Sequence, residues 1–392
     1  MKTGGRVYGL GSIMRRELRR MLGHPLYLLC MLGAPLFSAL FFLSLMHKGL
    51  PTDLPLAVVD LDNSAASRAL VRQLDASPQA KVLFTTASFT QARIEMQKEH
   101  IYGIFCIPAH FATEAATGKR PVLSFYTNGA FFLASSLLFR DMKTLAEMAG
   151  ASVGLQQGRA RGYTDAQIMG QLQPIKIDLH ALGNPWQSYA VYLCNVILPG
   201  VLQLMIFLIT AYSIGMEIKH GTAARWLQMG GGSIARCLAG KLLPQTGIFT
   251  LVGFTLLSLL YGYNAFPLKN GWAPMLAAMF LLVLASQSMG AFMIAMLPTP
   301  RLGLSFASLF GILSFSLAGL SFPVRQMYPS IQAIAELFPL RHYFIIYLDQ
   351  ALSGRSLFYS WASYCSLAAF LLLPFLTGRR LKKALLYMKY IP

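Results

Sequence analysis

Long apolar stretches recur along this chain and predict a bundle of membrane-spanning helices. A bilayer core of about 30 Å needs about 20 apolar residues in a helix that rises about 1.5 Å per residue. Six stretches meet this length, and none carries Lys, Arg, Asp or Glu in its interior. They cover residues 25–46, 190–216, 242–263, 272–297, 302–322 and 357–377. The pattern therefore predicts an α-helical membrane protein with six transmembrane helices, five of them within residues 190–377.

The segment before the first stretch, residues 1–24, has the pattern of an amphipathic helix. Ile13, Leu18, Met21 and Leu22 lie roughly on one side of that helix, and four arginines (Arg15, Arg16, Arg19 and Arg20) lie on the other. Such a helix rests in the membrane interface and anchors the first span. No small-x-small cleavage site follows the first stretch, so we interpret it as an uncleaved span, not a signal peptide.

Residues 47–189, between the first and second stretches, have the composition of one soluble domain. Strands are expected at 56–60, 101–107, 122–127 and 175–179. Helices are expected at 65–74, 89–99, 131–158 and 165–172, the first of them capped by the side chains of 62–64. Because strands and helices alternate, an inserted α/β domain with a small sheet is predicted.

Composition and charge fix the class of protein and its orientation. Of the 392 residues, 55% are hydrophobic and only 12% are charged, although Lys and Arg outnumber Asp and Glu by 33 to 15. So many hydrophobic residues exclude a disordered chain. So few charged residues exclude a nucleic-acid-binding protein, although the net charge is +18. The positive charge gathers in 1–24, the loop 217–241, the turn 298–301 and the tail 378–392. Both termini are therefore expected in the cytoplasm, and 47–189 and 323–356 on the far side.

Catalytic and metal-binding motifs are absent from the sequence. It has no G-x-x-x-x-G-K-[ST], G-x-S-x-G, H-E-x-x-H or C-x-x-C, and its seven histidines lack ligand spacing. Asp60 and Asp62 form a carboxylate pair suited to metal binding, but their place between a strand and a helix favours turn formation. The run Gly230–Gly232 is interpreted as a helix stop. We expect no enzyme activity, metal or cofactor in this chain.

The predicted spans also lack the ionisable group that an ion-coupled carrier uses to bind its coupling ion. Their most polar residues are Asn195, Gln203 and Gln287. The energy for transport must then come from elsewhere, which favours a permease driven by a separate ATPase. The alternative from another class is a cell-surface receptor or scaffold that uses the soluble domain as its binding module.

The loop 217–241 offers a place where such an ATPase docks. Thr222 is placed to cap a short helix and Gly230 to end it. On that helix Trp226 and Met229 form a small apolar face beside Arg225. If this face is exposed, it suits docking into a groove of a partner protein. The other interpretation, which composition leaves open, is a helix that lies on the lipid headgroups.

Three regions of the chain, the loop after the second stretch, the soluble domain and the segment before the last stretch, resemble type-2 ABC exporter permeases. The segment E-I-K-H-G-T-A-A-R-W-L-Q-M (217–229), followed by Gly240 and Lys241, is similar to the family's E-x-x-x-G-T…L…GK region. The segments 57–68 and 103–111 resemble the subgroup with a large domain after the first span. Residues 318–343 resemble its proline-rich external segment, where the chain re-enters the membrane as short helices. The chain departs from the family pattern at Ala223, where many relatives carry an acid, and at Gly230–Gly232.

The resemblance implies a permease subunit of an ATP-driven exporter, which moves a hydrophobic or amphipathic substrate outward across a bacterial inner membrane. It implies a cytoplasmic ABC ATPase that carries ATP and Mg, and a second permease chain, identical or paralogous. A periplasmic membrane-fusion adaptor is a further partner it allows. The implied ATPase-docking residues are Glu217, His220, Gly221, Thr222, Arg225, Trp226 and Met229. Those of the external re-entrant segment are Pro323, Pro329, Pro339 and Arg341.

Overall fold

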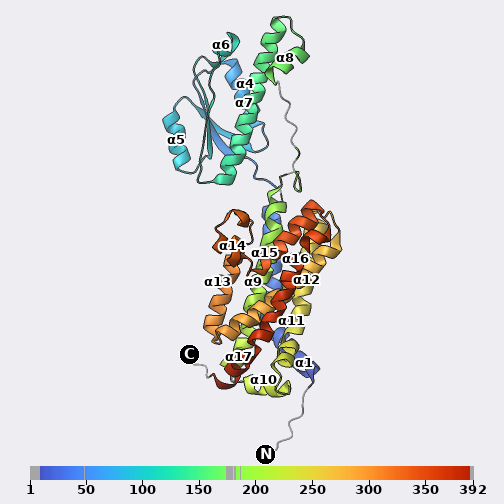
Figure 1. The fold of residues 1–392 in the computed structure, drawn as a ribbon. Helices are drawn as coiled ribbons and strands as arrows, with labels where there is room; N and C mark the ends of the chain where they lie inside the picture. The colour runs from blue at the N-terminus through green and yellow to red at the C-terminus, as the bar shows by residue number, and fades with distance from the viewer. Residues whose placement is uncertain (1–8, 48, 174–179, 181, 186, 389–392) are drawn as a thin grey trace, which may run out of the picture. The chain divides into compact units, whose positions relative to one another are not determined.

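The computed structural model describes residues 9–47, 49–173, 180, 182–185 and 187–388, and the chain divides into two compact units. One unit, the helical bundle, is made of Met1–Gly49 and Ala181–Pro392. The other, the α/β unit, is Leu50–His180. Figure 1 labels the helices of the two units.

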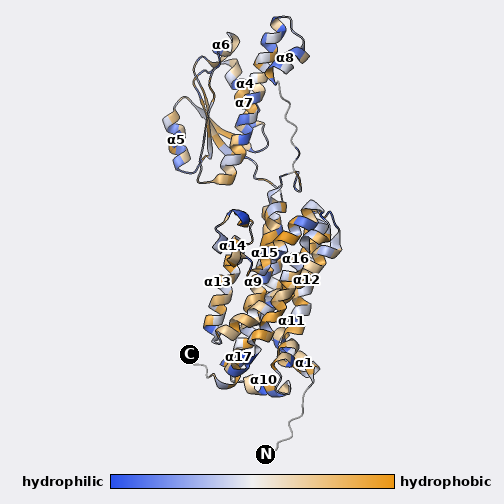
Figure 2. Cartoon of the chain, in the orientation of Figure 1, coloured by the Kyte–Doolittle hydropathy of each residue, from blue (hydrophilic) through white to orange (hydrophobic). Residues whose placement is uncertain are grey.

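The described part of the bundle contains six helices that are long and apolar enough to cross a membrane, as the sequence predicted. Figure 2 shows their hydrophobic residues along most of their lengths. The six are Pro25–Leu45, Tyr189–Lys219, Ile234–Tyr263, Trp272–Met296, Pro300–Leu317 and Leu357–Tyr387. Their α-helical parts are α2 (Pro25–Leu28), α3 (Ala34–Leu45), α9 (Tyr189–Lys219), α11 (Ile234–Leu257), α12 (Trp272–Met296), α13 (Pro300–Leu317), α16 (Leu357–Ala369) and α17 (Leu373–Tyr387), and short π and 3₁₀ segments continue or join some of them.

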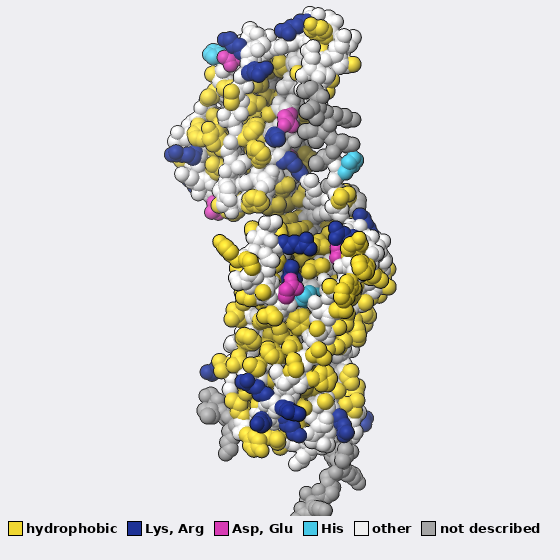
Figure 3. All heavy atoms as spheres, in the orientation of Figure 1, with side chains coloured by type: hydrophobic (Ala, Val, Ile, Leu, Met, Phe, Trp, Pro, Cys, Tyr) yellow, Lys and Arg dark blue, Asp and Glu magenta, His cyan; other side chains and the backbone are white. Residues whose placement is uncertain are grey.

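Shorter helices complete the bundle. They are α1 (Leu10–Gly23) before the first span, α10 (Ala223–Met229) between α9 and α11, and α14 (Pro329–Ala335) and α15 (Pro339–Ile346) before the last span. The helices α1, α10 and α17 lie at the same end of the bundle (Figure 1). Lys and Arg side chains gather on the surface at that end, below a broad hydrophobic band (Figure 3).

The helices α9 and α12 form the centre of the bundle. Of their most apolar 18 residues, 67% and 72% are buried, against 17% for both the first and the last span. The predicted polar residues of the spans bind other helices. Asn195 Oδ1 accepts from Tyr261 Oη at 2.8 Å, Gln203 Nε2 donates to Ser314 Oγ at 2.9 Å, and Thr246 Oγ1 donates to Gln287 Oε1 at 2.7 Å. Such pairs hold helices together in an apolar environment.

The α/β unit contains a four-stranded sheet in the order β2-β1-β3-β4. The strands are β1 (Leu54–Asp60), β2 (Ala80–Thr86), β3 (Gly103–Ile107) and β4 (Ser124–Thr127). Both β2 and β3 run parallel to β1, and β4 runs antiparallel to β3. The first, third and fourth match strands that the sequence predicted.

Helices cover both faces of this sheet. On one face Leu56, Val58 and Phe105 pack with residues of α4 (Ala65–Asp75) and α7 (Phe132–Ala160). On the other face Ala57 and Ile104 pack with Ala92 of α5 (Phe89–Gln97). The unit also contains α6 (Phe111–Ala116) and α8 (Asp165–Leu172), and α8 packs back on α7.

Two elements of the α/β unit were not predicted, and several helix bounds in the bundle differ from the predicted ones, among them the end of α13 at Leu317 instead of 322. These elements are β2 and α6, which correspond to no predicted strand or helix. The expected strand at 175–179 lies outside the described residues. In the bundle, α11 begins at Ile234 instead of 242, and the last helix continues to Tyr387 instead of 377. The longer α11 contains Lys241, a charged residue that the predicted span excluded.

Candidate functional site

The connection from α9 to α11 is a tight turn, the short helix α10 and a second tight turn. Gly221 has a left-handed backbone with φ of +64°, a conformation that glycine adopts without strain. Gly230 follows the last residue of α10, as predicted. Gly231 and Gly232 have φ of 62° and 74°, so the glycine run turns the chain into α11 and forms no phosphate loop.

Beneath the first turn, Glu217 is fully buried and accepts hydrogen bonds from three cationic residues. Its Oε1 lies 3.0 Å from Lys241 Nζ and 2.9 Å from Arg20 Nη1, and it also accepts from Arg16 Nη2. Its Oε2 accepts from Thr222 Oγ1. The Thr222 side chain therefore does not cap α10 as predicted, because its hydroxyl binds the carboxylate instead.

A second buried carboxylate, Glu17 of α1, completes the set. Glu17 Oε2 lies 2.9 Å from Lys241 Nζ without hydrogen-bond geometry, and Glu17 Oε1 accepts from Arg16 Nη2 at 2.7 Å. We call Arg16, Glu17, Arg20, Glu217 and Lys241 the charge cluster. Its two carboxylates and three cations join α1, α9 and α11. Because buried charges are costly unless paired, the cluster fixes these helices relative to one another.

Docking through the apolar face of α10 requires that face to be exposed, and the structure does not expose Trp226. Its side chain is completely buried, packed in a core that includes Ile13, Ile218 and Leu238. Lys241 Nζ lies 4.9 Å from the centre of the Trp226 ring, a cation–π contact. A seven-residue helix that follows a span gains most by turning its largest apolar side chain toward the bundle. Trp226 is therefore an anchor of α10 in this chain.

The residues that α10 and its first turn expose are polar or small. Among the implied docking residues, His220, Gly221 and Arg225 are exposed, Thr222 and Met229 are half-buried, and Glu217 and Trp226 are buried. Ala224 and Gln228 are also exposed. We call His220, Gly221, Ala224, Arg225 and Gln228 the docking surface. His220 Nδ1 lies 3.5 Å from Arg20 Nη2, next to the charge cluster.

Close packing of α1 on α11 depends on Gly240. A Cβ atom at this position would lie 2.8 Å from both Cβ and Cγ2 of Ile13, closer than packed atoms approach. The next residue, Lys241, then reaches Glu17 and Glu217 together. The pair Gly240–Lys241 thus has two separate tasks, close approach and charge pairing.

The other predicted residues have structural roles. Pro329 and Pro339 begin α14 and α15, and Pro323 precedes a short 3₁₀ turn, so the expected short helices are present. Arg341 Nε donates to Glu336 Oε1 at 2.9 Å. Asp60 accepts from the backbone N–H of Asp62 and Asn63, as expected for turn formation. Among the described residues no group of three His, Cys, Asp or Glu side chains is placed to hold a metal ion.

Sequence reasoning missed Arg16, Glu17, Arg20 and Lys241 as parts of this site. One signal was present: Ile13, Glu17 and Met21 follow one another at intervals of four and are all buried in the structure. An acid within such a stripe indicates a buried partner of opposite charge. The predicted apolar side of α1 divides in the structure: Ile13 and Met21 are buried in the bundle, whereas Leu18 and Leu22 are 43% and 63% exposed, as a helix in the membrane interface allows.

Comparison with known proteins agrees with this architecture. The model of the family described as "ABC-2 family transporter protein" matches residues 25–379. The linearmycin resistance permease protein LnrN of Bacillus subtilis (strain 168) is 24% identical over 342 residues, which cover 82% of this chain and 86% of that protein. The family match includes all six long apolar helices up to residue 379, together with Glu217, α10 and Lys241. The chain therefore belongs to the ABC-2 family of transporter proteins and is a transmembrane permease of an ABC transporter.

Proposed function

We propose that this chain is the permease subunit of an ATP-driven exporter that moves a hydrophobic or amphipathic compound outward across a bacterial inner membrane. Membership of the ABC-2 family supports the reliance on a separate ATPase. The sequence has no phosphate-binding loop of its own. The name of the Bacillus relative refers to resistance, which favours outward movement of a compound over uptake.

The proposed orientation puts both termini, α1 and α10 in the cytoplasm and the α/β unit on the outer side. The clustering of Lys and Arg at the end of the bundle that holds α1, α10 and α17 supports it (Figure 3). In that orientation the α/β unit extends the exit path or receives a periplasmic adaptor. ATP and Mg belong to the partner ATPase, and two permease chains pair in the complete transporter.

We place the ATPase contact at the docking surface rather than at Trp226. The observation that carries this assignment is the burial of Glu217, which is bound by side chains from α1 and α11 and by Thr222. A displacement of the turn before α10 should move the neighbouring helices with it, because the paired charges beneath the turn connect it to α1, α9 and α11. Movement of the ATPase then passes into α9, which packs on α3, α12 and α13.

The roles of the implied docking residues divide accordingly. Glu217, Thr222 and Trp226 position α10, whereas His220, Gly221 and Arg225 face the ATPase, joined by Ala224 and Gln228. Met229 is half-buried, and its sulfur lies 4.0 Å from Arg16 Nη1, so we assign it to positioning as well.

The test is purification of the full-length chain from its native membrane in several mild detergents, with mass spectrometry of the proteins that accompany it. The proposal predicts a cytoplasmic ATPase in stoichiometric amount. Recovery of the chain alone in every detergent, from cells that express ABC ATPases, would contradict it.

A further inference from the structure

The arginines of α1 divide into two pairs with different surroundings. Arg16 and Arg20 reach Glu217 on the inner side of the helix. Arg15 and Arg19 are exposed, and neither forms an ion pair or hydrogen bond with the part of the chain that the structure describes. The two exposed guanidinium groups are four residues apart, one turn of helix, and therefore lie next to each other on the surface.

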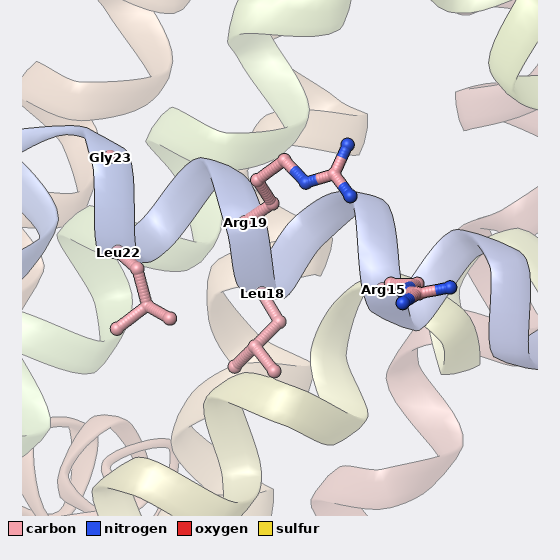
Figure 4. A pocket seen from close by; sticks show the side chains of 5 residues that line it. All are labelled: Arg15, Leu18, Arg19, Leu22 and Gly23. Atoms are coloured by element: carbon pink, nitrogen blue, oxygen red, sulfur yellow. The ribbon is translucent and has the colours of Figure 1, made fainter.

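Two exposed leucines alternate with these arginines. Leu18 and Leu22, again four residues apart, are 43% and 63% exposed. Together with Arg15, Arg19 and Gly23 they line a shallow open groove of about 450 Å³. In Figure 4 the two leucines extend from one edge of the helix, whereas Arg19 extends from the opposite edge. The groove therefore has a cationic side and an apolar side.

This groove lies where the chain enters its first span. Two residues after Gly23, Pro25 begins the first apolar helix, whose Leu26 and Leu29 are 37% and 62% exposed. The apolar side of the groove thus continues into a surface of the kind that faces acyl chains. A guanidinium binds phosphate oxygens in a bidentate manner, and the headgroup region of a bilayer supplies phosphate at this level.

We propose that the outer face of α1 is a binding site for one anionic phospholipid of the leaflet on the side of the termini. Arg15 and Arg19 hold its phosphate, and Leu18 and Leu22 lie against the first carbons of its acyl chains. Two cations without a partner among the described residues alternate with two exposed leucines, and the leucines lead into the exposed apolar surface of the first span. A lipid, which has a charged headgroup and apolar chains, fits this arrangement better than a protein partner, which would not need an apolar surface that extends along the span. The site is independent of the ATPase, so its failure and that of the proposed function are separable.

The test uses the full-length chain, purified without partners, and counts bound lipid by native mass spectrometry. Phosphatidylglycerol and phosphatidylcholine with the same acyl chains are titrated onto the wild type, Arg15→Gln/Arg19→Gln and the control Arg225→Gln/Arg236→Gln. The control removes two exposed arginines from the same end of the bundle. Since one basic residue near a lipid surface contributes about fivefold in affinity, the first variant should lose about thirtyfold for phosphatidylglycerol. The control should lose little.

Three results would overturn the proposal. One is wild-type affinity for phosphatidylglycerol in Arg15→Gln/Arg19→Gln. Another is an equal loss in the control, which would show diffuse attraction by net charge instead of a site. The third is full competition by inorganic phosphate, which would show that the groove takes a free anion. Because Arg15 and Arg19 have no protein partner among the described residues, the variant should retain the size-exclusion profile of the wild type.

Discussion

Lys241 of α11 and Glu217 of α9 form an ion pair in which both side chains are fully buried, with Nζ 3.0 Å from Oε1. The same ammonium group lies 2.9 Å from Glu17 of α1 and above the ring of Trp226. One lysine therefore contacts a span, the leading helix and the short helix α10. This arrangement makes the charge cluster a joint between the docking surface and the membrane helices.

Removal of one charge from the joint should destabilise the bundle strongly. Lys241→Met leaves two buried carboxylates with fewer partners, and loss of one member of a buried pair costs about 3–5 kcal/mol. The measurement is the melting temperature of the detergent-solubilised chain. The control is Glu147→Gln, which removes the exposed 3.7 Å pair with Lys143 and should cost less than about 1 kcal/mol. Equal melting temperatures for the two variants would rule out a stabilising joint.

Trp226 should behave as a packing residue. Trp226→Ala empties a completely buried site, and such truncations cost about 3–5 kcal/mol. Trp226→Phe keeps an aromatic ring beneath Lys241 and removes an indole N–H that has no hydrogen-bond partner among the described residues. We expect the phenylalanine variant to melt near the wild type and the alanine variant to melt far lower. If both variants melt like the wild type, the side chain is not an anchor.

Gly240 and Gly247, both on α11, offer a matched pair of substitutions. Gly240→Ala should push α1 away, because its Cβ would lie 2.8 Å from two atoms of Ile13. Gly247→Ala meets no atom within 4 Å and should be neutral or slightly stabilising, since alanine favours a helix by about 1 kcal/mol over glycine. Thermal unfolding of both variants tests this. A lower melting temperature for Gly247→Ala than for Gly240→Ala would contradict the packing of α1 on α11.

Topology can be tested with a membrane-impermeant maleimide on intact cells. We expect Ser152→Cys, on an exposed position of α7, to react from outside, and Gln228→Cys, on the docking surface, to react only after lysis. The variants are made in a Cys365→Ser background, because Cys365 is exposed. Cys106 of the α/β unit should contribute little, since burial raises its thiol pKa to about 11. Labelling of both positions from outside would contradict the proposed orientation.

Elements with a local signal were predictable from the sequence. The six spans follow from uninterrupted apolar length, and α4 follows from Ser64, whose hydroxyl accepts from the N–H of Ser67 at 3.1 Å. Strand β2 was missed although Ser77 and Pro78 signal a turn before it, because Leu83, which is 54% exposed, interrupts the alternation of apolar and polar residues that marks a half-buried strand. Local pattern also placed α10 within one residue of its observed bounds.

The face that α10 buries could not be predicted in the same way. Glu217 is 24 residues from Lys241 and 201 residues from Arg16, and no local period connects positions so far apart. From the local sequence alone, without knowledge of the charge cluster, Trp226 and Met229 form an apolar face that could equally be exposed or buried. The burial of Trp226 depends on α1, a helix distant in sequence, because Ile13 packs in the same core as Trp226 and Glu17 pairs with Lys241 beside it.

The most direct measurement is the amount of ATPase that accompanies charge-reversed variants of the chain through purification from native membranes. Arg225→Glu changes an exposed residue of the docking surface, and Arg236→Glu makes the same change at an exposed position of α11 outside it. Interface arginines frequently contribute about 2 kcal/mol, so Arg225→Glu should retain at most about a tenth of the wild-type ATPase at an unchanged melting temperature. Arg236→Glu should retain nearly all of it. Full retention of the ATPase by Arg225→Glu, or equal loss in both variants, would contradict docking at this surface.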